Sequence, residues 1–596
     1  MDCSDDLNSI LDNLKETLDK FDQKTEPFSE WSVESALRSI CESLELPNIT
    51  TPLIAEKMAF EFCPDYKNEL TGWGTYYGPQ CVLPNPEGTA VERPSIRAIT
   101  AHIIEYWSDR SKTAKHPILR ARYADLVWDF QKHVTGQAPH YSMAQIVIDS
   151  TIEMTEKNCH AIKVEAIDRL ERALHLALSL GDSERIQKVA FAIIAYEDVV
   201  ADDSKPGLWG FAYEMLFDND KIKLTAGQRQ KLLDDMESRL QRLSNPDKGP
   251  PNSFAAEKAA LLLANYYHKT GQKEDVKRVI SAIGSAFLQA GSEQSTLVLL
   301  AYLQRVHVNY KQFGLKDEAD EMVIQLNEIG EKAISELKPI SVTTETPKEE
   351  LEEFVSQLTA GDFDEAMGRI TGYFIAKKAE VESQLKELSG KAPLLFMIPH
   401  QLLDNTGRPL AKIGPLEEDL EGHTVYWMSQ MLSFDPVSLR QVMGSLKEKY
   451  PAFENLFLEY IFRSPIFKDD KKPIIQRGVK AYAKGCHIEA VHLLVPQIES
   501  ALRVLVEEDG GSILKPARRG AFHLKGLDDL FREPKIIEVF GEDIIFYFRV
   551  LLSDQRGWNI RNNVCHGLSE AAYFESRVSD RIIHVLLCLA LVRKAE

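Results

Sequence analysis

Three side chains late in the sequence have the types and spacing needed for chemistry on a phosphodiester. Arg561 is followed directly by Asn562 and, after three further residues, by His566. An imidazole titrates near neutral pH and can act as general base or acid, and a guanidinium can bind phosphate oxygens. These groups suffice for RNA cleavage by the RNA's own 2′-OH, a reaction that requires no metal. The motif therefore predicts a metal-independent ribonuclease site with no cofactor.

The spacing alone is not specific, because an Arg five residues before a His occurs at two other places. Arg518 precedes His523, but Pro516 and Gly520 predict a loop there, in which a fixed geometry is hard to maintain. Arg97 precedes His102, whose following residues look like the inner face of an ordinary helix. We expect neither pair to be catalytic.

The residues around Arg561 distinguish it from these two pairs. Asn559 can cap the start of a helix just before Arg561, and Gly567 can end that helix just after His566. The sequence therefore predicts a short helix that carries little except the motif. On such a helix, at about 100° per residue, Arg561 and His566 project about 140° apart. One copy cannot easily direct both groups at one phosphate, whereas two facing copies can.

Structural roles for the same residues stay open at this point. Arg561 could form an ion pair with Glu499 or with another acid, and His566 could bond to a carbonyl at the helix end. Both side chains are also favourable near a helix C-terminus because of the helix dipole. We expect Glu499 and Arg503 to be structural rather than catalytic.

Composition points to a folded protein of several domains. The chain has 596 residues, of which 44% are hydrophobic and 27% charged, so it is too long for one core. Its eight cysteines form no C-x-x-C pair and no Cys/His cluster with zinc spacing, and we do not expect His487 and His492, five apart, to bind a metal. The N-terminus is acidic, and the apolar run at 582–592 is short of a membrane span. We expect a soluble cytoplasmic protein that contacts no membrane.

The net charge of -20 argues against nucleic-acid binding over the whole surface. The charge is unevenly distributed, because residues 481–596 have 15 basic and 16 acidic residues, a net of -1. Residues 510–526 contain no acid and form a basic strip that could meet RNA or could be a solvated loop. The bases of the basic strip are Lys515, Arg518, Arg519 and Lys525.

Helical periodicity dominates the chain, and convincing alternating strands are absent, so we expect an all-α fold. The clearest amphipathic segments are 162–178, 255–267, 279–288 and 493–506. Four turns, each with a Gly between two predicted helices, are spaced irregularly and indicate tetratricopeptide-like repeats. They lie at Gly181, Gly271, Gly314 and Gly361.

Breaks in composition divide the chain into four predicted domains. Residues 338–350 contain two Pro and a Thr/Ser run typical of a linker, and a further break lies near 468–473. The predicted domains are an N-terminal helical domain, a helical-repeat region, a helical connecting domain and a terminal bundle. They span residues 1–140, 141–345, 346–475 and 476–596.

The terminal bundle resembles a HEPN domain (higher eukaryotes and prokaryotes nucleotide-binding), and Arg561, Asn562 and His566 match the Arg-polar-x-x-x-His motif of the nuclease members of that superfamily. Residues 496–503 and 557–559 also resemble the C-terminus of a family of large uncharacterised bacterial helical proteins, and residues 121–128 resemble its N-terminal half. The resemblance implies an endoribonuclease whose site forms across a homodimer, with Asn562 orienting the pair. It also implies bacterial antiviral defence or toxin-like growth arrest.

Two functions from different classes therefore stand as hypotheses. The first is a dimeric endoribonuclease that acts on RNA and whose helical repeats respond to a protein or ligand trigger. The second is a non-enzymatic helical adaptor whose terminal bundle dimerises or binds nucleotide. The apolar face of the last helix exceeds what a small bundle obviously needs, which favours a dimer, although core packing would also explain it. That face comprises Ile582, Ile583, Leu586, Leu587 and Leu591.

Overall fold

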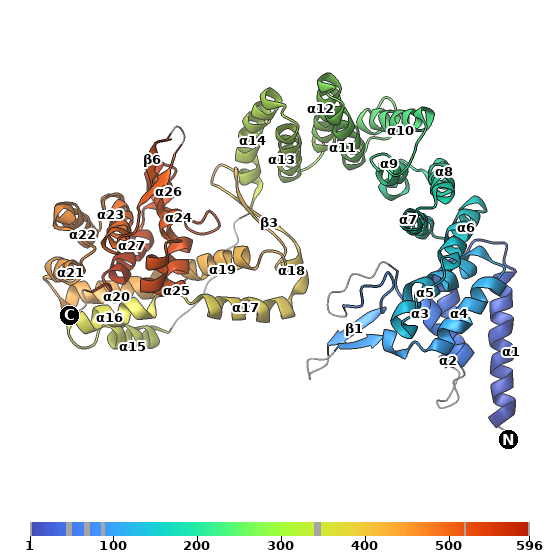
Figure 1. Ribbon diagram of the computed structural model, residues 1–596. Coiled ribbons are helices and arrows are strands. Elements are labelled where there is room, and N and C mark those ends of the chain that lie inside the picture. Colours follow the sequence, from blue (N-terminus) through green and yellow to red (C-terminus); the bar gives the residue numbers. More distant parts are fainter. Residues whose placement is uncertain are drawn as a thin grey trace. The chain divides into compact units, whose positions relative to one another are not determined.

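The computed structural model describes residues 3–42, 51–64, 72–84, 90–338, 347–434, 436–517 and 520–593. In these residues the fold is all-α, with six short strands in three antiparallel two-stranded hairpins (Figure 1). The all-α fold is as expected, and the sequence did not predict the short hairpins. Within the described residues, no helix is both long and apolar enough to cross a membrane.

The chain forms two compact units, residues 1–325 and 326–596. Their boundary falls inside helix α14, Lys316–Glu336, and the predicted linker at 339–346 lies outside the described residues. The finer division into four domains stays a prediction.

The first unit begins with helices that surround one apolar core containing Trp107, Tyr123 and Phe130. Helices α10 to α13 then pack each against the next along the chain. The elements of this unit are α1 (Cys3–Asp22), α2 (Glu30–Glu42), α3 (Thr51–Glu61), β1 (Cys81–Pro84), β2 (Ala90–Arg93), α4 (Ala101–Thr113), α5 (Pro117–Thr135), α6 (Ser142–Glu156), α7 (Lys163–Leu180), α8 (Ser183–Val200), α9 (Phe211–Leu216), α10 (Ala226–Ser244), α11 (Ser253–Lys269), α12 (Lys273–Gly291) and α13 (Thr296–Gln312).

The four predicted glycine turns each join two helices. The φ angles of Gly181, Gly271, Gly314 and Gly361 lie between 64° and 79°, a left-handed conformation that other residues adopt only with strain. Side-chain caps then start the next helix in two of these turns, since Asp182 accepts from the Arg185 amide and Asp362 from the Glu365 amide. The first three turns lie in the first unit, whereas Gly361 lies in the second.

In the second unit the long helix α23 lies beside α22 and α27 (Figure 1). Helix α23 packs against α22, α25, α26 and α27, and the apolar side chains of these helices belong to one core. The elements of this unit are α15 (Lys348–Leu358), α16 (Phe363–Tyr373), α17 (Lys378–Lys391), α18 (Pro393–Met397), β3 (His400–Leu403), β4 (Pro409–Ile413), α19 (Leu420–Phe434), α20 (Pro436–Lys449), α21 (Phe453–Phe462), α22 (Lys472–Ala483), α23 (His487–Glu508), β5 (Leu514–Pro516), β6 (Phe522–Leu524), α24 (Leu527–Leu530), α25 (Pro534–Leu552), α26 (Ile560–Cys565) and α27 (Ser576–Leu589).

The predicted apolar face of α27 is part of this core. Ile582, Ile583, Leu586 and Leu587 are each 0% exposed, and only Leu591, beyond the helix end, reaches 45%. Core packing, the alternative that the sequence left open, therefore accounts for this face, and it does not support a dimer. These side chains pack against α23 and its neighbours within one chain.

Candidate active site

Helix α26 carries the motif and is as short as the sequence predicts. It follows Asn559, whose φ of 51° is left-handed, and Gly567, with φ 63°, lies just beyond its end. Asn559 occupies the cap position, but its side chain makes no cap hydrogen bond to the backbone. Ile560 and Val564, one turn apart, are buried and fix one side of the helix against the core.

The turn before α26 is joined to the end of α25. The amide of Trp558 donates to the carbonyl oxygen of Val550 over 2.8 Å, and the Trp558 indole donates to the Ser429 carbonyl of α19 over 3.2 Å. A Cβ atom at Gly557 would lie 2.2 Å from the Val550 oxygen, so no side chain fits there. This close approach fixes where α26 begins.

The Arg561 guanidinium is held by two acceptors. Its Nε donates to Glu499 Oε2 of α23 over 3.0 Å, and its Nη1 donates to Asn562 Oδ1 over 3.0 Å. Glu499 is only 7% exposed, and its other oxygen accepts a hydrogen bond from Arg503. The ion pair that the sequence left open as an alternative is thus present. Glu499, Arg503 and Arg561 form a group that we call the trio at Glu499. One carboxylate faces two guanidinium groups in it, so the trio has one net positive charge.

Asn562 orients Arg561 but not His566. Its Oδ1 accepts from Arg561, while its Nδ2 donates to Asn559 Oδ1 over 2.8 Å. The left-handed residue before the helix is therefore also a hydrogen-bond partner of the motif. The sequence predicts Asn559 only as a backbone cap, and its side-chain contact with Asn562 follows from the folded structure alone.

The imidazole of His566 lies at the open end of α26. The residue is exposed, and its ring makes no hydrogen bond or ion pair with any residue that the structure describes. Its backbone amide still closes the helix by donating to the Asn562 carbonyl over 3.0 Å. The motif thus presents a guanidinium that is held in place and, five residues later, an exposed imidazole without a side-chain partner among the described residues.

The basic strip is a hairpin rather than the loop expected from Pro516 and Gly520. Strands β5 and β6 pair antiparallel, with Lys515 opposite His523. Lys515 Nζ lies 2.5 Å from Asp529 and Lys525 Nζ 2.7 Å from Glu533, so acids from outside the strip neutralise both lysines. Arg518 and Arg519 lie outside the described residues. The Lys525 carbonyl accepts from Arg503 over 3.1 Å, which links the hairpin to the trio at Glu499.

The other Arg/His pair and the remaining candidate histidines have ordinary surroundings. Arg97 is exposed in a single 3-10 turn, and His102, expected on the inner face of α4, is exposed and 3.5 Å from Glu105. His487 contacts Ser579, and His492 contacts the Ile488 carbonyl one turn earlier. In the described part of the chain, no three His, Cys, Asp or Glu side chains are grouped so as to hold a metal ion.

Comparison with known proteins gives one partial match. The model of one family, described as a domain of unknown function (DUF7380), matches residues 100–189. This segment comprises α4 to α7 and the beginning of α8, less than a sixth of the chain, and lies in the first unit. No curated protein and no solved structure matches the chain. The family match therefore does not extend to the unit that carries Arg561 and His566.

Proposed function

We propose that the protein is a metal-independent endoribonuclease with a composite Arg/His site formed on dimerisation. One observation carries the proposal. On a single short helix, Arg561 is held in place by Glu499 and Asn562, while the His566 ring has no partner among the described residues. The Nη2 of Arg561 likewise donates to no described residue and remains available for a phosphate oxygen.

The reaction follows from what these two groups can do. The 2′-OH of a nucleotide attacks the adjacent phosphorus while His566 takes its proton, and the bond to the 5′-oxygen of the next nucleotide breaks. Water protonates that leaving oxygen, and His566 afterwards returns its proton to the solvent. Arg561 stabilises the negative charge that develops on the non-bridging oxygens. The products are a 2′,3′-cyclic phosphate and a free 5′-OH.

A second copy supplies what one copy lacks. Arg561 and His566 lie five residues apart on a short helix, and no hydrogen bond joins their side chains. Two copies of α26 that face each other can pair the guanidinium of one chain with the imidazole of the other, which gives two equivalent Arg/His sites in a dimer. We therefore propose a homodimer through residues 476–596, which form the HEPN-like bundle of this proposal.

The remaining helices take a regulatory role in the proposal. The consecutive packing of α10 to α13 supports a tetratricopeptide-like repeat scaffold that responds to a trigger and restrains the nuclease. Such control fits antiviral defence or growth arrest in bacteria, in which RNA cleavage must stay off until it is needed.

A non-enzymatic adaptor is the second candidate function, and a specific observation favours it. Glu499 already binds Arg561, and acids neutralise both described lysines of the basic strip. Under this alternative, the trio at Glu499 only stabilises the bundle, and the repeats bind a partner protein.

An RNA cleavage assay with the purified full chain separates the two functions. We expect cleavage to persist in EDTA and to leave 2′,3′-cyclic phosphate ends, because the attacking oxygen belongs to the RNA itself. RNA with 2′-deoxyribose at the cut site should resist cleavage. Loss of activity on chelation with rescue by magnesium, or cleavage of the deoxy-substituted RNA, would refute the proposed mechanism. No cleavage by the wild-type dimer would favour the adaptor.

A further inference from the structure

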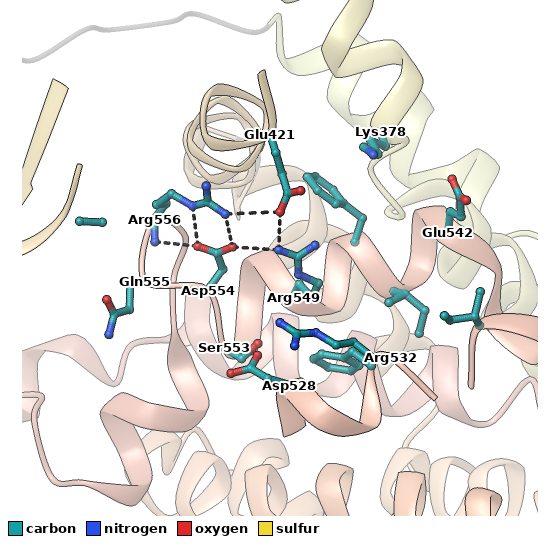
Figure 2. A pocket seen from close by; sticks show the side chains of 15 residues that line it. Lys378, Glu421, Asp528, Arg532, Glu542, Arg549, Ser553, Asp554, Gln555 and Arg556 are labelled. Atoms are coloured by element: carbon teal, nitrogen blue, oxygen red, sulfur yellow. Dashed lines mark hydrogen bonds and ion pairs between the residues drawn. The ribbon is translucent and has the colours of Figure 1, made fainter. Parts of the chain in front are cut away.

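The second unit has a cavity of about 690 Å³ that is separate from the motif helix. It is lined by residues of α17, α19, α24 and α25 and of the turn at 553–556 (Figure 2). This volume is in the range of pockets that enclose a small molecule. None of Arg561, Asn562 and His566 lines it.

One side of the cavity is held rigid by ion pairs. Arg556 binds Asp554 through Nε and Nη2, over 3.0 and 2.8 Å. Arg549 Nη2 donates to Glu421 Oε1 over 2.7 Å and lies 3.3 Å from Asp554 (Figure 2). The hydrogen bond from Arg549 lowers the pKa of Glu421, which keeps that carboxylate charged. Both carboxylate oxygens of Asp554 therefore accept hydrogen bonds, whereas only Nη2 of Arg549 donates any to a described residue.

Three groups of hydrogen-bond donors in the cavity are left without partners among the described residues. Arg532 is exposed and makes no ion pair, and Nε and Nη1 of Arg549 are unused. Ser553 is only 7% exposed, and its hydroxyl has no hydrogen-bond partner. A buried hydroxyl without a partner costs free energy, and a ligand gains from bonding to it once the Ser553 side chain turns toward the cavity. Figure 2 shows Arg532, Arg549 and Ser553 lining the same part of the cavity.

The other residues that line the cavity are apolar or acidic, and they limit which ligands can bind. Ile545 and Phe546 of α25 are largely buried and add a small apolar area to the lining, and Lys378 and Arg549 lie 5.3 and 5.7 Å from the centroid of the Phe546 ring. Asp528 and Glu542 are exposed in the same lining, and neither has a partner among the described residues. With Glu421 and Asp554 they give the lining four carboxylates, which balance its four basic side chains. An anion in this cavity must therefore bind through the basic side chains that keep unused donors, Arg532 and Arg549.

We infer that this cavity binds a small organic phosphate monoester. Arg532 and Arg549 bind the phosphate oxygens in charge-assisted hydrogen bonds, Ser553 donates its hydroxyl proton to one of them, and the ester group packs on Ile545 and Phe546. A tetrahedral dianion offers enough acceptor oxygens for all three residues at once. The inference is independent of the proposed RNA cleavage, because it shares no residue with the motif.

Isothermal titration calorimetry of the full chain with three probes tests this inference. The probes are inorganic phosphate, phenyl phosphate and benzoate. We expect phenyl phosphate to bind at least about tenfold more tightly than inorganic phosphate, because only phenyl phosphate buries a ring. It should also bind more tightly than benzoate, whose planar carboxylate satisfies fewer donors. Tighter binding of benzoate, or no heat with phenyl phosphate at millimolar concentration, would overturn the inference.

Variants locate the binding to this cavity. Arg532→Gln should weaken phenyl phosphate binding at least about tenfold, and Ser553→Ala about three- to tenfold. Arg477→Gln is the matched control, because Arg477 is an exposed arginine on α22 without an ion pair among the described residues. It should leave the affinity unchanged. Arg532 is exposed, so its replacement should not unfold the chain, and equal binding by Arg532→Gln and wild type would refute the site.

An Arg561→Ala variant separates this inference from the proposed nuclease. It should bind phenyl phosphate as the wild type does, whatever it does to RNA. If Arg561→Ala abolished phenyl phosphate binding while Arg532→Gln did not, the anion would bind at the motif and the cavity assignment would be wrong.

Discussion

Arg561 donates from Nε to Oε2 of Glu499 over 3.0 Å, across 62 positions of sequence. This bond joins the short helix α26 to the long helix α23 and leaves the guanidinium with a fixed direction. Because Glu499 also accepts from Arg503, it balances only one of the two positive charges. The same contact is compatible with a catalytic and with a structural Arg561, and the following experiments distinguish the two roles.

Removal of either motif side chain should abolish cleavage. We expect Arg561→Ala and His566→Ala each to lower the rate at least about a thousandfold, because they remove phosphate stabilisation and proton transfer. Circular dichroism melting should show little change for His566→Ala, since the ring is exposed. Arg97→Ala and His102→Ala, at the same spacing in the first unit, are the controls. A folded but inactive control variant would show that the wrong pair was chosen.

Glu499→Gln tests the support of Arg561. Loss of the charge should destabilise the second unit by about 1–3 kcal/mol, because two guanidinium groups lose a charged acceptor in a buried position. If Arg561 is catalytic, the cleavage rate should also fall about 10- to 100-fold. Glu489→Gln on the same helix is exposed and should change neither quantity. Reduced stability with an unchanged rate would assign Arg561 a structural role.

Mixed dimers report how the two chains share a site. Arg561→Ala and His566→Ala protein should each be inactive alone and regain activity when mixed. About a quarter of wild-type activity is expected at most, because half of the dimers are mixed and each contains one intact Arg/His combination. Full activity of wild-type protein at concentrations where sizing shows only monomer would contradict a shared site.

Stability should decrease in acid because of His584, which lies in the core of the second unit. Burial lowers the pKa of His584 from 6.5 to about 3, and its ring nitrogens contact Tyr547 and the Thr371 carbonyl. The unfolded chain takes up this proton below about pH 6.5, whereas the folded chain does so only near pH 3. Stability from the neutral ring is therefore complete above pH 6.5 and is lost as the pH falls toward 3.

Thermal unfolding of wild type and His584→Gln at pH 7.5 and pH 5.0 measures this contribution. The wild type should lose more stability between the two values than the variant, because the variant has no imidazole to protonate. Equal losses would mean that other groups carry the acid sensitivity.

The helices were largely predictable from the sequence, whereas contacts between distant segments were not. Periodicity located α7, α11, α12 and α23 because each buries one face of a regular helix, and Gly567 correctly marked the end of α26. Strands β5 and β6, of three residues each, are too short to show a two-residue alternation. The motif could be recognised in the sequence because Arg561, Asn562 and His566 lie within six consecutive residues.

In the second unit, the sequence did not predict which helix faces are buried or which distant segments lie together. The apolar residues of α27 looked like a free surface because nothing in a linear pattern tells a face covered by the same chain from one covered by a second copy. The cavity is lined by Lys378, Glu421, Arg532 and Ser553, which belong to four separate segments. No local motif marks such a site, and only the folded chain brings its residues together.

Gly557 has no functional group, yet the position of the motif depends on it. A Cβ atom would collide with the Val550 oxygen that accepts the Trp558 amide, so even alanine would move the start of α26. In a set of related sequences, selection for the motif should therefore appear as an invariant glycine four residues before Arg561, and an insertion between the two should be as rare as loss of His566.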